Sequence, residues 1–189
     1  MSKKLKAIKF IIFCCFFFNF VPSISQTGAS SITIQLSEIA PLNNIIQHDN
    51  PRKISPIIFE DFSGNKVNLR DYYGKLVIVN FWATWCKPCK KEMPSLDSLS
   101  QNEDFKNLVI FPVNIENLNY KKTKEFFSNL NIKKLEIFFD PNLNFVKELK
   151  LRGVPTTVII NKRGEEIARI IGSIDFKDKK FLKWLSNYD

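Results

Sequence analysis

Two kinds of hydrophobic pattern alternate along the chain. Short apolar runs predict buried strands at 76–81, 108–111, 135–139 and 156–160. Between them, apolar residues recur every three or four positions among charged residues, which predicts amphipathic helices. One such segment follows residue 86, a second covers 120–130, a third contains Phe145 and Leu149, and the last starts near Asp175. Strands alternating with helices predict an α/β fold, with a sheet that is covered on both faces.

Turn residues add a hairpin at each end of this alternation. Residues 63–65 (Ser-Gly-Asn) separate strand-like runs at 56–59 and 66–69. Residues 161–164 separate the 156–160 strand from another at 166–171. Glycine and asparagine between two apolar runs are typical of a β-hairpin turn.

Two residues are expected to mark element boundaries. Pro112 should end the 108–111 strand, because proline has no N–H to donate to a strand ladder. Asp175 is a good N-cap and should begin the last helix, which buries Phe181, Leu182 and Leu185.

Residues 1–25 have the layout of an export signal. Lysines open the segment, residues 10–21 are apolar apart from Asn19, and Ser23 and Ser25 stand at the positions that a signal peptidase reads. The apolar stretch of about 12 residues is shorter than the roughly 20 that a membrane-spanning helix needs. We therefore expect export to a periplasm or an equivalent compartment, with a cleaved signal favoured over a retained membrane anchor.

Residues 26–53 carry little pattern and predict a linker before a domain at 54–189. Ser, Asn, Gln and Pro are scattered through this segment. The single histidine of the chain, His48, falls within it. Nothing nearby would complete a metal site, so His48 is predicted to be a solvated linker residue.

The net charge of +9 does not point to nucleic acid. Four lysines fall in residues 1–25, which contain no acidic residue, and the rest of the chain has 24 basic and 19 acidic residues. Because this smaller surplus is spread through helices of mixed charge, it predicts a solvated surface. We expect no nucleic-acid partner.

The two cysteines of the domain lie where a buried strand meets a helix. Cys14 and Cys15 belong to the N-terminal segment, so only Cys86 and Cys89 remain, too few for a disulfide framework. At a helix start, unpaired N–H groups and the helix dipole stabilise a thiolate and lower the thiol pKa. We predict a redox-active dithiol, with an exposed Cys86 as the nucleophile and Cys89, one turn inward, as the resolving thiol.

The residues around the cysteines fit this chemistry. Lys87 adds a nearby positive charge, and Pro88 presets the backbone of the first helical turn. Glu92 lies three residues after Cys89, on the same helix face. A buried carboxylate there would raise the thiol pKa by like-charge repulsion and could relay a proton. The alternative is a surface glutamate paired with a lysine.

Other features of the sequence limit the chemistry. A zinc site would need two more ligands, and neither a second cysteine pair nor a suitably placed histidine exists. We expect no metal and no cofactor. Val154-Pro155 opens the 156–160 strand, and the sequence leaves the isomer of this peptide bond open.

Three motifs together resemble the thioredoxin superfamily: NFWATWCKPCKKEMP, GVPTT and NKRGEEIARIIG. Within it, the chain looks most similar to the exported TlpA/ResA-like branch of thiol–disulfide oxidoreductases, over residues 54–189. The resemblance implies a thioredoxin fold, in which helices flank a central mixed sheet. It also implies an N-terminal β-hairpin and a strand–helix insertion near 120–139.

For the site, the resemblance implies a nucleophilic Cys86, a resolving Cys89 and a cis-proline at Pro155 that faces the disulfide. Trp85 and Val154 stand next to these residues in the motifs and are expected to support the site and bind substrate.

Two further positions separate the branches of the superfamily. Glu92 falls where the TlpA/ResA-like branch has its buried active-site glutamate. Asn80 stands where cytosolic thioredoxin has a buried aspartate, and this departure argues against a general cytosolic thioredoxin.

Members of the branch reduce disulfides in apocytochrome c or in copper-site assembly proteins, and they receive electrons from a membrane thiol-transfer protein. The resemblance therefore implies a reductant of a disulfide-bearing client protein. A disulfide oxidase or isomerase is the alternative. We expect the protein to be a monomer.

Two other activities lack a required residue. A peroxiredoxin-type peroxidase would need the pattern Pro-x-x-x-Thr-x-x-Cys, which neither Cys86 nor Cys89 completes. A non-enzymatic copper metallochaperone of the Sco type would have three residues between its cysteines and a histidine downstream. This chain has two residues between them and no histidine after His48.

Overall fold

The computed structural model describes residues 44–189, so the predicted signal at 1–25 and the predicted linker as far as residue 43 lie outside the described residues. The elements are, in order, β1 (Ile45–Lys53), β2 (Ile58–Asp61), β3 (Lys66–Asn68), the 3-10 helix η1 (Leu69–Tyr72), β4 (Leu76–Trp82), α2 (Lys87–Leu99), β5 (Leu108–Asn114), α3 (Tyr120–Asn129), β6 (Phe138–Phe139), α4 (Asn144–Glu148), β7 (Thr156–Ile160), β8 (Glu165–Ile171) and α5 (Lys179–Leu185). Among these helices of the described part, none is long and apolar enough to cross a membrane.

The strands form one mixed sheet in the order β1-β8-β7-β4-β5-β6-β2-β3. At its centre, β4 pairs in parallel with β5 and antiparallel with β7. The predicted hairpin of β2 and β3 forms one edge. Helix α3 and strand β6 form the predicted inserted segment. The expected architecture, a mixed sheet flanked by helices with these two additions, is confirmed.

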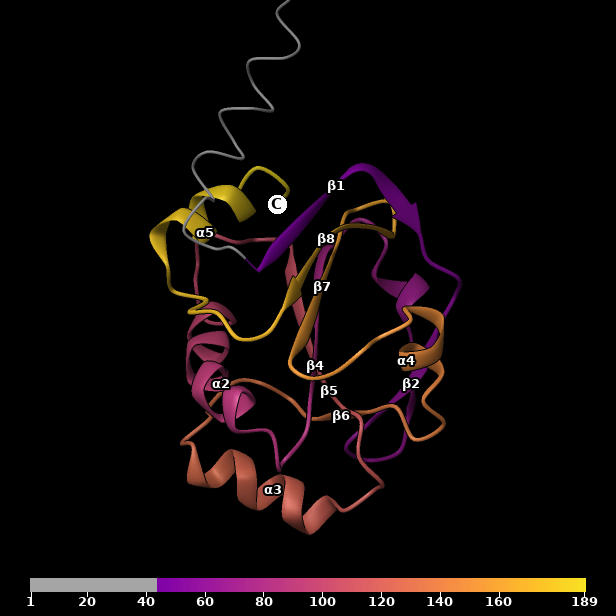
Figure 1. Cartoon of the computed structure of the whole chain (residues 1–189), viewed down its shortest axis with the longest axis vertical. Helices are drawn as coiled ribbons and strands as arrows, with labels where there is room; N and C mark the ends of the chain where they lie inside the picture. The colour runs from indigo at the N-terminus through magenta and orange to yellow at the C-terminus, as the bar shows by residue number, and fades with distance from the viewer. Residues whose placement is uncertain (1–43) are drawn as a thin grey trace, which may run out of the picture.

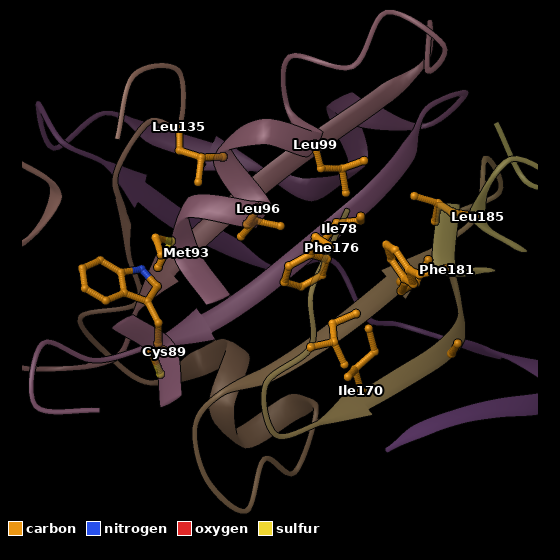
Figure 2. Close-up of a cluster of buried hydrophobic side chains, with 14 of the residues drawn as sticks. Ile78, Cys89, Met93, Leu96, Leu99, Leu135, Ile170, Phe176, Phe181 and Leu185 are labelled. Carbon is orange, nitrogen blue, oxygen red and sulfur yellow. The ribbon is translucent and has the colours of Figure 1, made fainter. Parts of the chain in front are cut away.

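β4 is buried on both faces, as its uninterrupted apolar run predicts. Ile78 and Trp82 belong to one core, and Val77 and Phe81 belong to the other. Helices α2 and α5 lie on one side of the sheet and α4 lies on the other (Figure 1). Figure 2 shows the first core, built by Ile78, Met93, Leu96, Leu99, Ile170, Phe176, Phe181 and Leu185.

The linker prediction is wrong for residues 45–53, which form the edge strand β1 beside β8 (Figure 1). The residues of β1 are half-buried or exposed, and the register with β8 shifts between Gln47 and Arg52. A half-exposed, irregular strand has no regular alternation of apolar and polar residues, so its pattern looked like a linker. The domain therefore begins before Ile54.

The prediction that His48 is solvated is wrong for the same reason. Its side chain is 6% exposed, and its Nε2 lies 2.9 Å from Oε1 of Glu166 on β8. The pairing of β1 with β8 creates this contact. Because the two residues are 118 positions apart, no local pattern reveals it.

Strand β5 continues through Pro112 to Asn114, contrary to the expectation that the proline ends it. The N–H of Ile115 donates to the carbonyl of Trp82, so alternate residues of β5 direct their N–H groups to β4 and the nitrogen of Pro112 faces away. On that other side, β6 pairs only with the last two residues of β5. The proline thus occupies an edge-like position and costs the ladder no donor.

The strand predicted at 135–139 is reduced to the two residues of β6, and at its predicted start the backbone is bound by Asp97. Asp97, buried on α2, accepts hydrogen bonds from the backbone N–H groups of Lys133, Lys134 and Leu135, at 2.8 to 3.0 Å. The N–H of Leu135, the first residue of the predicted strand, is therefore not available to a neighbouring strand.

Asp178, not Asp175, caps the last helix. Its Oδ1 accepts from the N–H groups of Lys180 and Phe181, at 2.8 and 3.1 Å. Asp175 instead accepts from the N–H of Lys177 in the preceding turn. Aspartate is equally suited to an N-cap at either position, so residue type alone does not distinguish them. Asp178 is the cap because the helix begins at Lys179.

Replacing Asp97 by alanine should lower the free energy of unfolding by about 2–4 kcal/mol, because three buried or half-buried N–H groups lose their acceptor. Asp97→Asn, which keeps one acceptor oxygen, should lose less. Urea unfolding of the wild type and both variants measures the difference. The control is Asp104→Ala, which removes an exposed aspartate. An equal effect of Asp97→Ala and Asp104→Ala would contradict this role for Asp97.

Candidate active site

Cys86 and Cys89 form a disulfide at the junction of β4 and α2. Cys86 is the N-cap of α2, and its Sγ accepts a hydrogen bond from the N–H of Cys89 at 3.1 Å. The backbone N–H of Cys86 donates to the carbonyl of Ala83 and fixes the turn before the helix. Pro88 lies in the first turn, where its missing N–H would have no helical partner. The sequence therefore places the sulfur of Cys86 against the unpaired donors of the helix start.

The expectation that Cys86 is exposed is wrong for the disulfide form. Cys86 is 2% exposed, and Cys89, at one end of the core in Figure 2, is fully buried. Both belong to the apolar core, against which Val154 packs. The exposed groups are the neighbours, with Trp85 67% exposed and Lys87 also at the surface. The disulfide bond to the fully buried Cys89 holds the sulfur of Cys86 inside the protein as well.

The peptide bond between Val154 and Pro155 is cis, which settles the isomer that the sequence left open. Thr156 begins β7 opposite Phe81 of β4, so Val154 and Pro155 lie beside the end of β4 that leads to the cysteines. The hydroxyl of Thr156 donates to the carbonyl of Gly153 at 2.7 Å and closes the loop. The structure thus brings together the two segments that the sequence motifs singled out.

Glu92 is a buried carboxyl group, and the alternative of a lysine-paired surface residue is wrong. It is 2% exposed, its Oε1 accepts from Nδ2 of Asn80 at 2.8 Å, and its Oε2 accepts from the N–H of Ile174 at 3.3 Å. Burial raises the pKa of Glu92 from 4.5 to about 7, against the opposite effect of these two hydrogen bonds. Near neutral pH this group can therefore accept or release a proton.

Asn80 holds Glu92 from the central strand. Its Nδ2 also lies 2.9 Å from Oγ1 of Thr157 on β7, so one amide joins α2, β4 and β7. The Oδ1 of Asn80 has no hydrogen-bond partner among the described residues. An aspartate at this position would put a second carboxylate beside Glu92, whereas the amide contributes no charge.

Glu116 is a site residue that the sequence reading missed. It accepts hydrogen bonds from the N–H and the hydroxyl of Thr84, two residues before Cys86, and from Lys122. Burial alone would raise the pKa of Glu116, but the bonds from Thr84 and Lys122 hold it below its ordinary value. Glu116 follows β5 and Thr84 follows β4. Because these two strands are parallel and adjacent, their carboxyl ends lie at the same edge of the sheet. A strand that ends at Pro112, as the sequence predicts, would not bring Glu116 to this edge, whereas β5 continues to Asn114 and does.

The profile described as Redoxin matches residues 53–181 of this chain.

Curated relatives of this chain include proteins named thiol–disulfide oxidoreductase ResA. One from Bacillus cereus is 31% identical over 115 residues, which are 61% of this chain and 65% of that protein. One from Geobacillus thermodenitrificans is 33% identical over 125 residues, which are 65% of this chain and 70% of that protein. The match thus spans less than two thirds of the length of the Bacillus cereus relative.

Solved structures share the fold. A secreted thiol-disulfide isomerase from Corynebacterium glutamicum superposes with a TM-score of 0.64 at 19% identity, covering 75% of this chain and 92% of that one. StoA from Bacillus subtilis gives a TM-score of 0.59 at 24% identity, covering 71% and 98%. The ResA relatives confirm the resemblance to the ResA-like branch, and the solved structures confirm the thioredoxin fold.

Proposed function

Because the chain belongs to the Redoxin family, we propose that it is a thiol–disulfide oxidoreductase that reduces disulfide bonds of client proteins. The observation that carries the proposal is the Cys86–Cys89 disulfide at the start of α2, with the buried carboxyl group of Glu92 on the same helix. The relatives named as thiol–disulfide oxidoreductases support it.

The reaction begins with the reduced dithiol. The thiolate of Cys86 attacks one sulfur of the client disulfide, a Cys86–client bond forms, and the client S–S bond breaks to release the first client thiolate. The thiolate of Cys89 then attacks Sγ of Cys86, forms the Cys86–Cys89 disulfide and releases the second client thiolate. Two electrons pass from the dithiol to the client, and the two client thiolates are protonated.

Glu92 supports the second step as a proton acceptor. The thiol of Cys89 must lose its proton before it can attack, and it is buried away from water. Glu92 lies one turn further along the same helix and has a pKa of about 7, which suits a group that takes up and returns a proton at neutral pH. Asn80 and the N–H of Ile174 hold the carboxyl group in place.

The direction of the reaction follows from the same carboxyl group. A negative charge beside the thiols disfavours their thiolate forms and therefore destabilises the reduced protein, which makes it a better electron donor. We expect a reduction potential at pH 7 below about −180 mV and closer to the about −270 mV of thioredoxin. Equilibration with dithiothreitol or glutathione buffers measures it. A value above about −180 mV would assign the protein to the isomerases or oxidases instead.

We also propose that the protein works outside the cytoplasm and takes its electrons from a membrane thiol-transfer protein. The signal-like pattern of residues 1–25 and the secreted protein from Corynebacterium glutamicum with the same fold support this setting. In an oxidising compartment a dithiol needs such a donor to stay reduced. Apocytochrome c and a copper-site assembly protein are the two candidate clients. We propose that the protein acts on them as a monomer.

A further inference from the structure

A cavity of about 830 Å³ lies between the edge strand β1, the neighbouring strand β8 and the segment 148–156. It extends along this segment to Val154 and Pro155. In Figure 1, β1 and β8 are adjacent and the segment after α4 leads to the start of β7. Val154 also packs against the core that contains Cys86 and Cys89. The polypeptide of a client bound at the disulfide would therefore extend past Val154 and Pro155 into this cavity.

The buried charges of the cavity neutralise one another. The carboxylate of Glu166 accepts two hydrogen bonds from Arg169, both at 2.8 Å. Nε2 of His48 lies 2.9 Å from Oε1 of the same carboxylate. Arg169 also donates to the carbonyl of Leu149 at 2.8 Å. These largely buried groups bond to one another and their charges cancel, so they form the floor of the cavity and leave no net charge there.

The rim of the cavity carries a surplus of positive charge. Arg52, Lys150 and Arg152 are exposed, and none of them has an ion pair within the described residues. Glu148, the other acidic residue of the lining, accepts from the N–H of Ser55 at 3.2 Å and offsets only one of these three positive charges. The net field at the rim is therefore positive and open to an anionic partner.

Two exposed apolar side chains lie in the same lining, Ile46 on β1 and Ile171 on β8. Exposed isoleucines beside unpaired basic residues suit a polypeptide that alternates acidic and apolar residues along an extended strand. A sphere of this volume would be roughly 12 Å across, which corresponds to three or four extended residues at about 3.3 Å each.

We propose that this basic cavity binds an acidic segment of the client polypeptide, within a few residues of the client cysteine that Cys86 attacks. The proposal rests on the proposed function and adds the sequence preference of its client. Rim charges act mainly on the rate of association and on its salt dependence. The preference should therefore appear in the second-order rate constant rather than in the chemistry of exchange.

The test uses the pre-reduced protein and two peptides with the same intramolecular disulfide. One peptide carries Asp and Glu beside its second cysteine, and the other carries Lys at the same positions. In low salt the acidic peptide should be reduced about tenfold faster, the size expected from two or three exposed ion pairs. The ratio should approach one at about 1 M salt, where the screening length falls to about 3 Å.

Charge reversal of the rim identifies the cavity as the cause. The double variant Lys150→Glu/Arg152→Glu should invert the ratio of the two rates. The matched control Lys179→Glu/Lys180→Glu makes the same charge change on exposed residues of α5 and should keep the wild-type ratio. An unchanged ratio in the rim variant, or equal rates for both peptides with the wild type, would overturn the inference.

A neutral small disulfide, bis(2-hydroxyethyl) disulfide, separates this inference from the proposed function. If the wild-type protein reduces it and both peptides without regard to their charge, the cavity inference fails while the proposed function stands. If the protein reduces none of the three substrates, the proposed function is wrong, and the cavity inference, which rests on it, falls with it.

Discussion

Cys86→Ser is expected to abolish disulfide reduction, leaving only the uncatalysed rate. Serine keeps the size of the side chain but has no thiolate, and the proposed first step requires the Cys86 sulfur to bond to the client. Reduction of a peptide disulfide by the pre-reduced protein measures the loss. Wild-type protein alkylated at its thiols serves as the reference for complete inactivation. Retention of activity by Cys86→Ser would show that another group is the nucleophile.

Cys89→Ser should react once and then stop. Cys86 can still attack the client, but no second thiol is present to release it, so the Cys86–client disulfide accumulates. In cells, the captured client can be identified by mass spectrometry after non-reducing purification, and that identification decides between apocytochrome c and a copper-site assembly protein. Full turnover by this variant would show that Cys89 is not the resolving thiol.

The second large effect concerns stability, where Glu92→Gln should remove a pH dependence from unfolding. The folded pKa of Glu92 is about 7, above its ordinary value of 4.5, so the folded protein keeps a proton that the unfolded chain loses. The contribution to stability is complete below pH 4.5, falls as the pH rises, and is lost above about pH 7. The loss amounts to about 3 kcal/mol.

Urea unfolding of the disulfide form at several pH values between 4 and 8 checks this expectation. The difference in stability between Glu92→Gln and the wild type should grow in favour of the variant by up to about 3 kcal/mol over that range. The matched control is Glu116→Gln, the same chemical change at a carboxyl group whose pKa is lowered. Its difference should stay nearly constant between pH 8 and pH 4.5, since the stability from Glu116 is present above pH 4.5 and is lost only as the pH falls below that value. Parallel pH profiles for the wild type and Glu92→Gln would contradict the assignment.

The elements that the sequence predicts well are those in which one physical signal dominates. Strand β4 has an uninterrupted apolar run because both of its faces are buried. The start of α2 is marked by Pro88, and the burial of Glu92 agrees with its spacing from Cys89 and with the family resemblance. In each case a short stretch of chain carries the information.

The parts that were not predicted depend on partners distant in sequence. β1 is a strand because β8 lies beside it, and the side chain of His48 is shielded from solvent because it contacts Glu166. Asp97 binds the backbone N–H groups of residues 133–135, which are 36 to 38 residues away, so the predicted strand does not begin at Leu135. The burial of Cys86 is likewise a property of the assembled core, which a helix start alone does not fix.

The double role of Cys86, as proposed nucleophile and as the group that caps the start of α2, bears on how inactive variants are interpreted. Serine ranks among the best residues at a helix N-cap, whereas alanine ranks among the poorest and would cost about 1 kcal/mol. Cys86→Ser therefore removes the sulfur but leaves a hydroxyl oxygen to receive the N–H of Cys89, which the sulfur binds in the native protein. Cys86→Ala would weaken the helix and the chemistry together. Serine is the substitution from which a loss of activity can be assigned to chemistry alone.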